Sequence, residues 1–193
     1  MTTKSNRAGV LQIAAIGLIL LVVVVLLRVE GRMFLCDCGH FALWTSDTCS
    51  ANTSQQLFDP YSFTHVLHGF LFFWLMAVLF RRLNKSWQVW LAVLLEGAWE
   101  LFENTPFVIN KYRTETAALG YTGDTIVNSF GDLTCALAGF LIARKLGLRR
   151  SLIVFLVIEL VLILWIHDSL LLQILMLMRP IAAIKSWQMC VSP

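Results

Sequence analysis

The sequence predicts an all-α membrane protein with five transmembrane helices and a cytoplasmic N-terminus. Of its 193 residues, 58% are hydrophobic and only 14% are charged. Soluble domains typically carry about 25% charged residues, so much of this surface must face something other than water. The composition excludes a soluble globular enzyme, a disordered chain and a nucleic-acid-binding protein. We expect residues 1–193 to form a single polytopic domain without nucleic-acid partners.

The first span is expected at residues 9–27, where Gln12 is the single polar side chain. A run of this length, at ~1.5 Å per residue, can cross the hydrocarbon core of a bilayer. The alternative is a signal peptide, because Lys4 and Arg7 precede the run. The apolar run is longer than the usual ~7–15 residues of such a segment, and no small-residue cleavage site follows before Cys36. We therefore interpret it as a retained helix.

Four more apolar stretches follow, separated by short polar links. They are residues 64–80, 87–103, 124–143 and 152–166. Cytoplasmic links concentrate Lys and Arg, and two links here are basic. One contains Arg81, Arg82 and Lys85, and the other contains Arg144, Lys145, Arg149 and Arg150. This pattern places residues 28–63 and 104–123 in outer loops and residues 167–193 in an outer tail.

The tail contains an apolar segment that is too short to cross a membrane. Residues 170–178 are apolar, but Arg179-Pro180 interrupts them before residues 181–187. A transmembrane helix needs about 20 apolar residues. The pattern favours a C-terminal interfacial or re-entrant helix instead.

Four of the five cysteines fall on the outer side of this topology, where disulfides can form. They are Cys36, Cys38, Cys49 and Cys190. Four cysteines allow three pairings, and sequence alone does not choose among them. The sequence Cys36-Asp37-Cys38-Gly39-His40 is also compatible with a zinc or copper site, although disulfide or plain structural roles are more common for so short a motif.

The strongest functional signal is the spacing of polar residues within the apolar stretches. Glu96, Glu100 and Glu103 stand at i, i+4 and i+7, and Asp124, Asn128 and Asp132 stand at i, i+4 and i+8. Each trio therefore occupies one helical face, and His65 and His68 share a face of the preceding span. A carboxylate inside a membrane helix costs about 2.5–3.5 kcal/mol on insertion scales. We expect these residues to line a shared cavity near the outer leaflet.

Such a cavity has several chemical uses. Its side chains could act as general acids and bases with shifted pKa values. The candidates are Glu96, Glu100, Glu103, Asp124, Asn128, Asp132, His65 and His68. They could also hold a divalent metal ion, for which the best ligands are His65, His68, Glu100, Glu103 and Asp124. Proton or cation relay and a polar seam that only joins helices remain as alternatives.

The expected outer loop before Asp124 adds Tyr112 and Arg113 above the acidic residues. Arginine and phosphate form strong paired hydrogen bonds, so these two residues could orient an anionic lipid headgroup. Alternatively, Arg113 pairs with Glu103 or Asp124 and closes the site electrostatically.

Several motifs together resemble an uncharacterised bacterial inner-membrane family, one known by a domain-of-unknown-function label. The motifs are Cys-Asp-Cys-Gly-His at 36–40, Asp-Pro-Tyr-Ser-Phe-Thr-His-Val-Leu-His-Gly at 59–69, Glu-Gly-Ala-Trp-Glu at 96–100, Glu-Asn-Thr-Pro-Phe at 103–107 and Gly-Asp-Thr at 123–125. The resemblance implies a multi-pass protein of the bacterial cytoplasmic membrane and assigns no activity. The region around Glu96 to Gly139 is also faintly similar to VanZ-like membrane proteins.

The leading hypothesis is an intramembrane enzyme or binding protein whose polar, metal-compatible site faces the outer side. Its partner would be a membrane lipid or a lipid-linked substrate. The alternatives are a structural or accessory subunit of a larger membrane complex, and ion or proton transport. A homo-oligomer is compatible with each of them.

Overall fold

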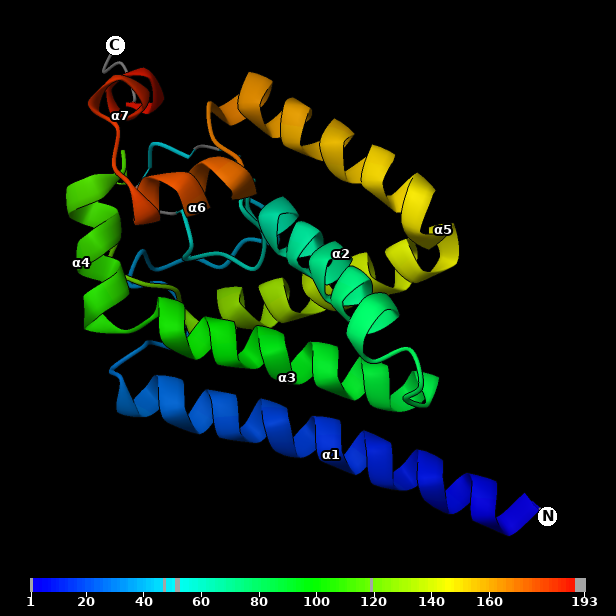
Figure 1. Cartoon of the computed structure of the whole chain (residues 1–193). Helices are drawn as coiled ribbons and strands as arrows, with labels where there is room; N and C mark the ends of the chain where they lie inside the picture. The colour runs from blue at the N-terminus through cyan, green and yellow to red at the C-terminus, as the bar shows by residue number, and fades with distance from the viewer. Residues whose placement is uncertain (1, 47, 51–52, 119, 190–193) are drawn as a thin grey trace.

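The computed structural model describes residues 2–46, 48–50, 53–118 and 120–189, with side chains from residue 9 onward. The described part of the chain contains seven helices (Figure 1): α1 (Thr2–Val29), α2 (Ser62–Leu79), α3 (Lys85–Glu103), α4 (Pro106–Glu115), α5 (Ile126–Ile166), α6 (Leu170–Met178) and α7 (Ala182–Gln188). Its only β-type pairing is an isolated bridge between Trp44 and Phe58. The predicted all-α class is confirmed.

The prediction of five transmembrane helices is wrong. Within the residues that the structure describes, two helical segments are long and apolar enough to cross a membrane, Gly9–Val29 of α1 and Ser62–Leu79 of α2. Helix α3 is present at the predicted position but carries Glu96, Glu100 and Glu103 within its length. A third candidate arises only if α5 and α6, which are bent by 75° at their junction, count as one broken span. The chain thus has the helices of a membrane-associated protein, but fewer clear spans than predicted.

Helices are present at both predicted positions, 124–143 and 152–166, and α5 joins them across a kink at Gly147 rather than through a longer link. Helix α5 changes direction at Gly147, whose φ of 76° and ψ of 172° are not helical. Glycine adopts positive φ without the steric cost that a Cβ atom imposes. Because the helix resumes at once, the basic residues expected in a link lie at the bend of α5.

The predicted outer segments contain further helices. The expected loop 104–123 contains α4, which begins with Thr105 accepting a hydrogen bond from the Val108 amide and with proline at its first position. Both are favourable helix starts. The tail forms two short helices, α6 and α7, separated at Arg179-Pro180 as the sequence indicates.

Two glycines allow α2 and α5 to cross in direct backbone contact. A Cβ atom on Gly69 would meet the backbone of Ala136 and Phe140, and one on Gly139 would meet the carbonyl of Val66. Small residues are the usual means of such close approach in helical bundles. Helix α3 packs against α5 on one side and α1 on the other, and Figure 1 shows α1 alongside α3. These contacts bring the polar faces of α2, α3 and α5 together.

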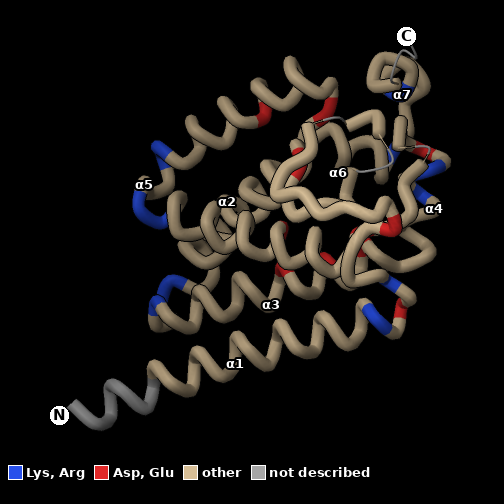
Figure 2. Tube along the Cα trace, turned by 180° about the vertical axis from the view of Figure 1, so that it is seen from behind, with Lys and Arg blue, Asp and Glu red and all other residues tan. Residues whose placement is uncertain are grey.

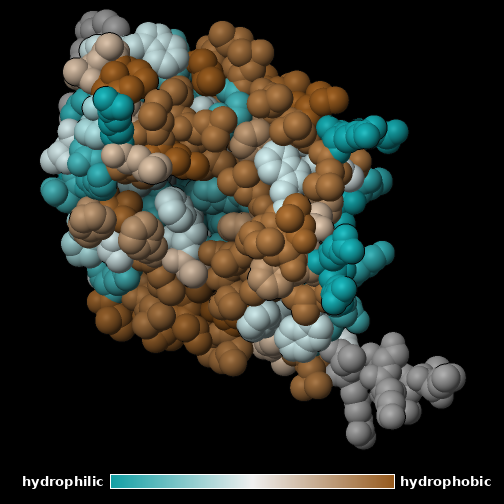
Figure 3. Space-filling view, viewed as in Figure 1, coloured by the Kyte–Doolittle hydropathy of each residue, from teal (hydrophilic) through white to brown (hydrophobic). Residues whose placement is uncertain are grey.

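Charge is distributed unevenly along the molecule. Figure 2 shows basic residues at the α5 bend and at the α2–α3 link, both at the same end, whereas most acidic residues lie inside or toward the other end. Figure 3 shows hydrophobic side chains over much of the surface between these polar ends. Exposed apolar side chains include Leu18, Ile153 and Leu164, each more than 60% exposed. An apolar belt between polar ends is typical of membrane-associated helices.

Candidate functional site

Two histidines of α2 hold one carboxylate of α3. His65 Nδ1 lies 2.6 Å from Glu96 Oε1, and His68 Nδ1 lies 3.1 Å from Glu96 Oε2. Glu96 is fully buried, and both histidines are 7% exposed. Both oxygens of Glu96 therefore have hydrogen-bonding partners, which is the usual condition for burying a carboxylate.

One turn further along α3, Glu100 is equally buried but lacks such partners. It is 0% exposed, and neither of its carboxylate oxygens has a hydrogen-bond partner among the described residues. The imidazole of His65 lies beside it, with Nδ1 3.4 Å from Glu100 Oε1. Burying a polar atom without a partner costs free energy. A proton on the carboxyl group or an ion bound to it would account for such an atom.

Asp132 of α5 completes the arrangement from the opposite side. Its Oδ2 lies 3.8 Å from His65 Nε2, and its Oδ1 accepts a hydrogen bond from the Ser62 hydroxyl at 2.9 Å. We call His65, His68, Glu96, Glu100 and Asp132 the acid–histidine cluster. It contains two groups whose possible ligand atoms lie within 4.8 Å of one another. One is His65, His68 and Glu96, and the other is His65, Glu100 and Asp132.

The two groups differ in their suitability for a metal ion. The atoms of Glu96 are committed to two histidine rings, whereas both oxygens of Glu100 are free to accept. Metal-bound histidines commonly donate their second ring nitrogen to a carboxylate. With Glu96 at Nδ1, His65 presents Nε2 toward Asp132. His65, Glu100 and Asp132 are therefore the better ligand set.

Asp124 belongs to a neighbouring but separate hydrogen-bonded unit. Asn104 donates from Nδ2 to Asp124 Oδ2 at 2.8 Å and accepts from the Asp124 amide at 2.7 Å. Tyr121 donates its hydroxyl to Asp124 Oδ1 at 3.0 Å. Because both oxygens are satisfied in this way, Asp124 is placed as a wall residue rather than as a ligand beside Glu100.

A cavity of about 660 Å³ opens above the cluster. Its lining includes Asp132 and His65 of the cluster, together with Glu103, Tyr112 and Asp124. Further walls come from the segment before α2 and from the tail helices. The volume lies within the ~300–1,000 Å³ typical of ligand pockets. The structure thus joins a buried ligand set to a space large enough for an organic molecule.

The other residues singled out in the sequence have varied places. Asn128 is buried and donates to the Gln56 carbonyl at 2.9 Å, so it secures a loop. Arg113 is exposed and donates from Nε to the backbone carbonyl of Tyr121. Among the residues that the structure describes, Arg113 forms no ion pair with Glu103 or Asp124. Tyr112 is buried against the cavity, 5.4 Å from the Tyr121 ring.

Burial and like charge alter the acids at the cavity wall. Burial raises the pKa of Glu103 to about 7, and the neighbouring Asp124 carboxylate adds to that rise. Burial likewise raises the pKa of Asp124, although hydrogen bonds from Asn104 and Tyr121 oppose the rise. The pKa of Tyr112 is raised well above its usual value by burial and then by the Glu103 charge. Tyr112 therefore remains a hydrogen-bond donor at neutral pH.

Sequence reasoning missed several supporting residues. Asp59 accepts from the amides of Ser54 and Tyr61 at 2.7 and 2.8 Å and fixes the entry to α2. Ser62 and Asn104 orient Asp132 and Asp124 respectively. The Asp-Pro-Tyr-Ser and Asn-Thr-Pro sequences are turn and helix-start signals. Those signals locate the turns, but not the carboxylates that they orient.

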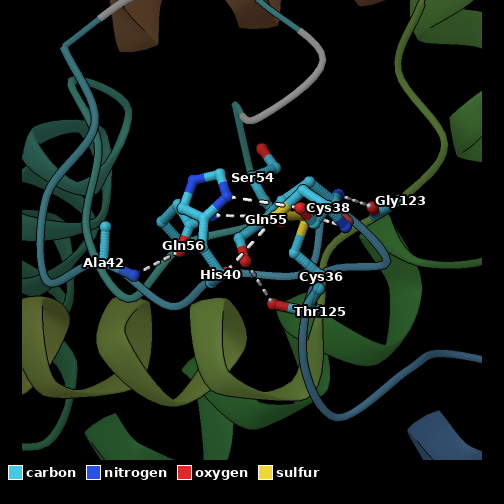
Figure 4. Close-up of a disulfide and its surroundings, with 9 residues drawn as sticks. All are labelled: Cys36, Cys38, His40, Ala42, Ser54, Gln55, Gln56, Gly123 and Thr125. Atoms are coloured by element: carbon cyan, nitrogen blue, oxygen red, sulfur yellow. Dashed lines mark hydrogen bonds between the residues drawn. A yellow bond between two sulfur atoms is a disulfide. The ribbon is translucent and has the colours of Figure 1, made fainter.

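The first two cysteines form a disulfide, Cys36–Cys38, shown with its surroundings in Figure 4. Gln56 donates to Cys38 Sγ at 3.3 Å, and His40 Nδ1 lies 3.4 Å from the Cys38 carbonyl. The disulfide interpretation thus holds for this pair, and both thiols are unavailable to a metal in this form. Cys190 lies outside the described residues, so its expected pairing stays a prediction.

Comparison with known proteins identifies the chain's relatives. The model of the family described as "Protein of unknown function (DUF2585)" matches residues 27–190. The chain belongs to this family. It is 40% identical over 185 residues to a UPF0314 protein of Rhizobium meliloti, covering 96% of this chain and 93% of the relative. It is 41% identical to a UPF0314 protein of Novosphingobium aromaticivorans, covering 95% and 93%.

A UPF0314 protein of Sinorhizobium fredii is 43% identical over 158 residues, or 82% of this chain and 80% of the relative. No solved structure matches the chain. The predicted resemblance to an uncharacterised bacterial family is confirmed. Because the matched range 27–190 contains the whole acid–histidine cluster, the DUF2585 family region includes the candidate site.

Proposed function

We propose that this protein is a multi-pass protein of the bacterial inner membrane that binds a divalent cation through His65, Glu100 and Asp132. The observation that carries the proposal is Glu100, which is fully buried with neither carboxylate oxygen hydrogen-bonded, beside a histidine and a second carboxylate. Oxygen and imidazole ligands together suit several divalent cations.

The cation would serve an intramembrane enzyme or binding protein acting on a lipid or lipid-linked substrate. A bound divalent cation polarises oxygen atoms of a substrate and lowers the pKa of coordinated water. The cavity adjoining Asp132 and His65 offers room for the substrate's polar group. Apolar surface around the molecule supports access from a bilayer (Figure 3). The basic end in Figure 2 supports a cytoplasmic location for that end and an outer-facing cavity.

Metal analysis of the purified protein tests this proposal. We expect about one divalent ion per chain after equilibration with Zn²⁺ or Mn²⁺ and removal of excess ion. Glu100→Gln and Asp132→Asn should each lose the ion while retaining helical circular dichroism. Glu159→Gln is the matched control, because Glu159 is also a buried acid of the bundle but accepts hydrogen bonds from the Leu171 amide.

A structural role in a larger membrane complex is the second candidate, and one specific observation favours it. Glu96 joins α2 to α3 through two histidines without an unsatisfied oxygen. A bundle held only by such bonds would bind no stoichiometric ion. Two results together would support this candidate over the metal site: the wild-type protein binds no metal, and the substitution Glu96→Ala destabilises the fold.

A further inference from the structure

Acidic residues outnumber basic ones in the lining of the cavity above the acid–histidine cluster, and the basic side chains in its described lining are two histidines, His65 and His167. Five carboxyl side chains line it: Asp59, Glu103, Asp124, Asp132 and Asp168. Among the lining residues that the structure describes there is no lysine and no arginine. A cleft lined by one sign of charge attracts ligands of the opposite sign. This charge pattern disfavours an anionic ligand.

Nearby basic side chains are engaged outside the cavity lining. Arg113 donates to the carbonyl of Tyr121, Arg32 to that of Thr122, and Lys185 to that of Thr114. Each of these bonds joins the side chain to the backbone around the cavity rather than to a carboxylate in it. Their charges are therefore not directed at the space where a ligand would lie.

The acids of the wall mostly accept hydrogen bonds that hold them in place. Asp168 accepts from the Ser169 amide at 2.8 Å and from Gln188 at 2.9 Å, and Asp59 accepts from two backbone amides. Glu103 is the exception, because its Oε2 is buried and has no hydrogen-bond partner in the described part of the chain. A positively charged group beside this oxygen, with or without an N–H donor, would compensate for its burial.

Aromatic rings supply the rest of the wall. Tyr61, Tyr112, Tyr121, Trp165 and Trp187 all line the cavity, and they come from different segments of the chain. The rings of Tyr112 and Tyr121 meet edge to face at 5.4 Å. Aromatic faces attract cations, most strongly when water is excluded, and groups of such rings bind quaternary ammonium ligands.

We propose that this cavity binds an ammonium group, carried either by a free amine or by the headgroup of a membrane lipid. The proposal deepens the proposed function, since it identifies the substrate class of the same site, but its recognition residues are not the cation ligands. Glu103 and the tyrosine and tryptophan rings bind the ammonium group, while His65, Glu100 and Asp132 hold the divalent cation below it. A cavity of about 660 Å³ is far larger than a second metal ion requires.

Binding of choline to the purified full-length protein in detergent is the first test. Choline should bind at least tenfold more tightly than 3,3-dimethylbutan-1-ol, which has the same shape without the charge. Equal binding of the neutral compound, or tighter binding of phosphate, would overturn the proposal. Glu103→Gln should weaken choline binding about tenfold and leave the bound divalent ion in place.

A second variant protects the test against misfolding of the first. Trp187→Leu removes one ring from the cavity wall on the peripheral helix α7 and should also weaken choline binding several-fold. Unchanged binding in both folded variants would contradict the proposed recognition. Loss of choline binding with a retained ion separates this inference from the metal proposal. If the wild-type protein binds choline but no divalent ion, the metal proposal alone is refuted.

Lipid bilayers distinguish the two sources of the ammonium group. In nanodiscs that mix phosphatidylethanolamine with phosphatidylglycerol, a headgroup ligand should co-purify as phosphatidylethanolamine and compete with added choline. For a free amine, choline should bind equally in both mixed and pure phosphatidylglycerol discs. Preferential retention of phosphatidylglycerol, with no binding of choline, would reject both forms of the inference.

Discussion

Glu96 and Glu100 lie one helical turn apart on α3, are equally buried and face the same histidine, yet their surroundings differ. Glu96 is hydrogen-bonded to two imidazoles, whereas neither oxygen of Glu100 is hydrogen-bonded. The first arrangement joins helices, and the second leaves an acceptor site in the protein interior. The contrast separates a structural carboxylate from one suited to binding a cation, although the two are indistinguishable by burial.

Removing Glu96 should have the largest effect on stability. Glu96→Ala leaves two buried imidazoles without their carboxylate, and breaking a buried charge pair costs about 3–5 kcal/mol. We expect a correspondingly lower thermal unfolding temperature in detergent. Glu115→Ala is the control, because Glu115 pairs with Lys111 at a 28% exposed position and should change stability by less than about 0.5 kcal/mol. If Glu96→Ala and Glu115→Ala lower stability equally, Glu96 is not the structural carboxylate described above.

The helix crossing that positions the cluster is the next most sensitive feature. Gly139→Ala places a Cβ atom against the Val66 carbonyl and should cost about 1–3 kcal/mol through overpacking. Because Val66 adjoins His65, metal affinity should fall as well. Gly17→Ala is the matched control, since a Cβ atom there meets nothing within 4 Å. A metal affinity that is unchanged in folded Gly139→Ala would show that this crossing does not set the site.

The carboxyl group of Glu103 should give a measurable pH dependence. Its pKa is raised from 4.5 to about 7, so the folded protein binds its proton more tightly than the unfolded chain does. Stability from this group is present at low pH and is lost as pH rises from about 4.5 to about 7. The negative charges of Asp124 and Glu96 raise the pKa of Glu103 further, whereas His65 and a hydrogen bond from Tyr112 lower it.

Glu103→Gln removes this titrating group and with it the loss of stability at high pH. Relative to its effect at pH 4.5, the substitution should stabilise the protein at pH 8 by about 1–3 kcal/mol. Unfolding temperatures measured at intervals from pH 4.5 to 8 check the expected change in slope. Parallel curves for the variant and the wild type would place the raised pKa on another group.

Replacing Glu100 should have the smallest effect on the stability of the metal-free protein. The amide in Glu100→Gln has nearly the same shape and carries no buried charge, so stability should stay within about 1 kcal/mol or increase. Ion binding should nevertheless be lost. A large destabilisation of the metal-free variant, resembling that of Glu96→Ala, would mean that both acids are structural.

The sequence predicts the meeting of polar faces well, because helical spacing alone places Glu96 and Glu100 on one face and Asp132 on another. It also locates α1, α2 and α3 closely. It predicts the spans at residues 9–27 and 64–80 but overestimates their total number, in part because the acids that mark the site also lower the apolar character of α3. The bend at Gly147 falls within the basic link expected between residues 143 and 152, where the positive φ of this glycine interrupts the helix.

The different roles of the acidic residues within the site are likewise not predicted by sequence patterns. Helical spacing alone does not distinguish Glu96, Glu100 and Glu103. Only the packing of α2 against α3 gives Glu96 both histidines as partners. Asp124 was grouped with the metal candidates, but Asn104 and Tyr121 satisfy its oxygens. Those partners come from separate segments of the chain, so their convergence appears only in three dimensions.

X-ray absorption spectroscopy of the Zn²⁺-loaded protein tests the central claim most directly, because it counts the imidazole ligands of the bound ion. Binding by His65, Glu100 and Asp132 predicts one imidazole together with oxygen ligands, and loss of the bound ion in Glu100→Gln but not in Glu159→Gln. Two imidazoles would place the ion at Glu96 with both histidines. That result, or the absence of a stoichiometric ion, would contradict the proposed site.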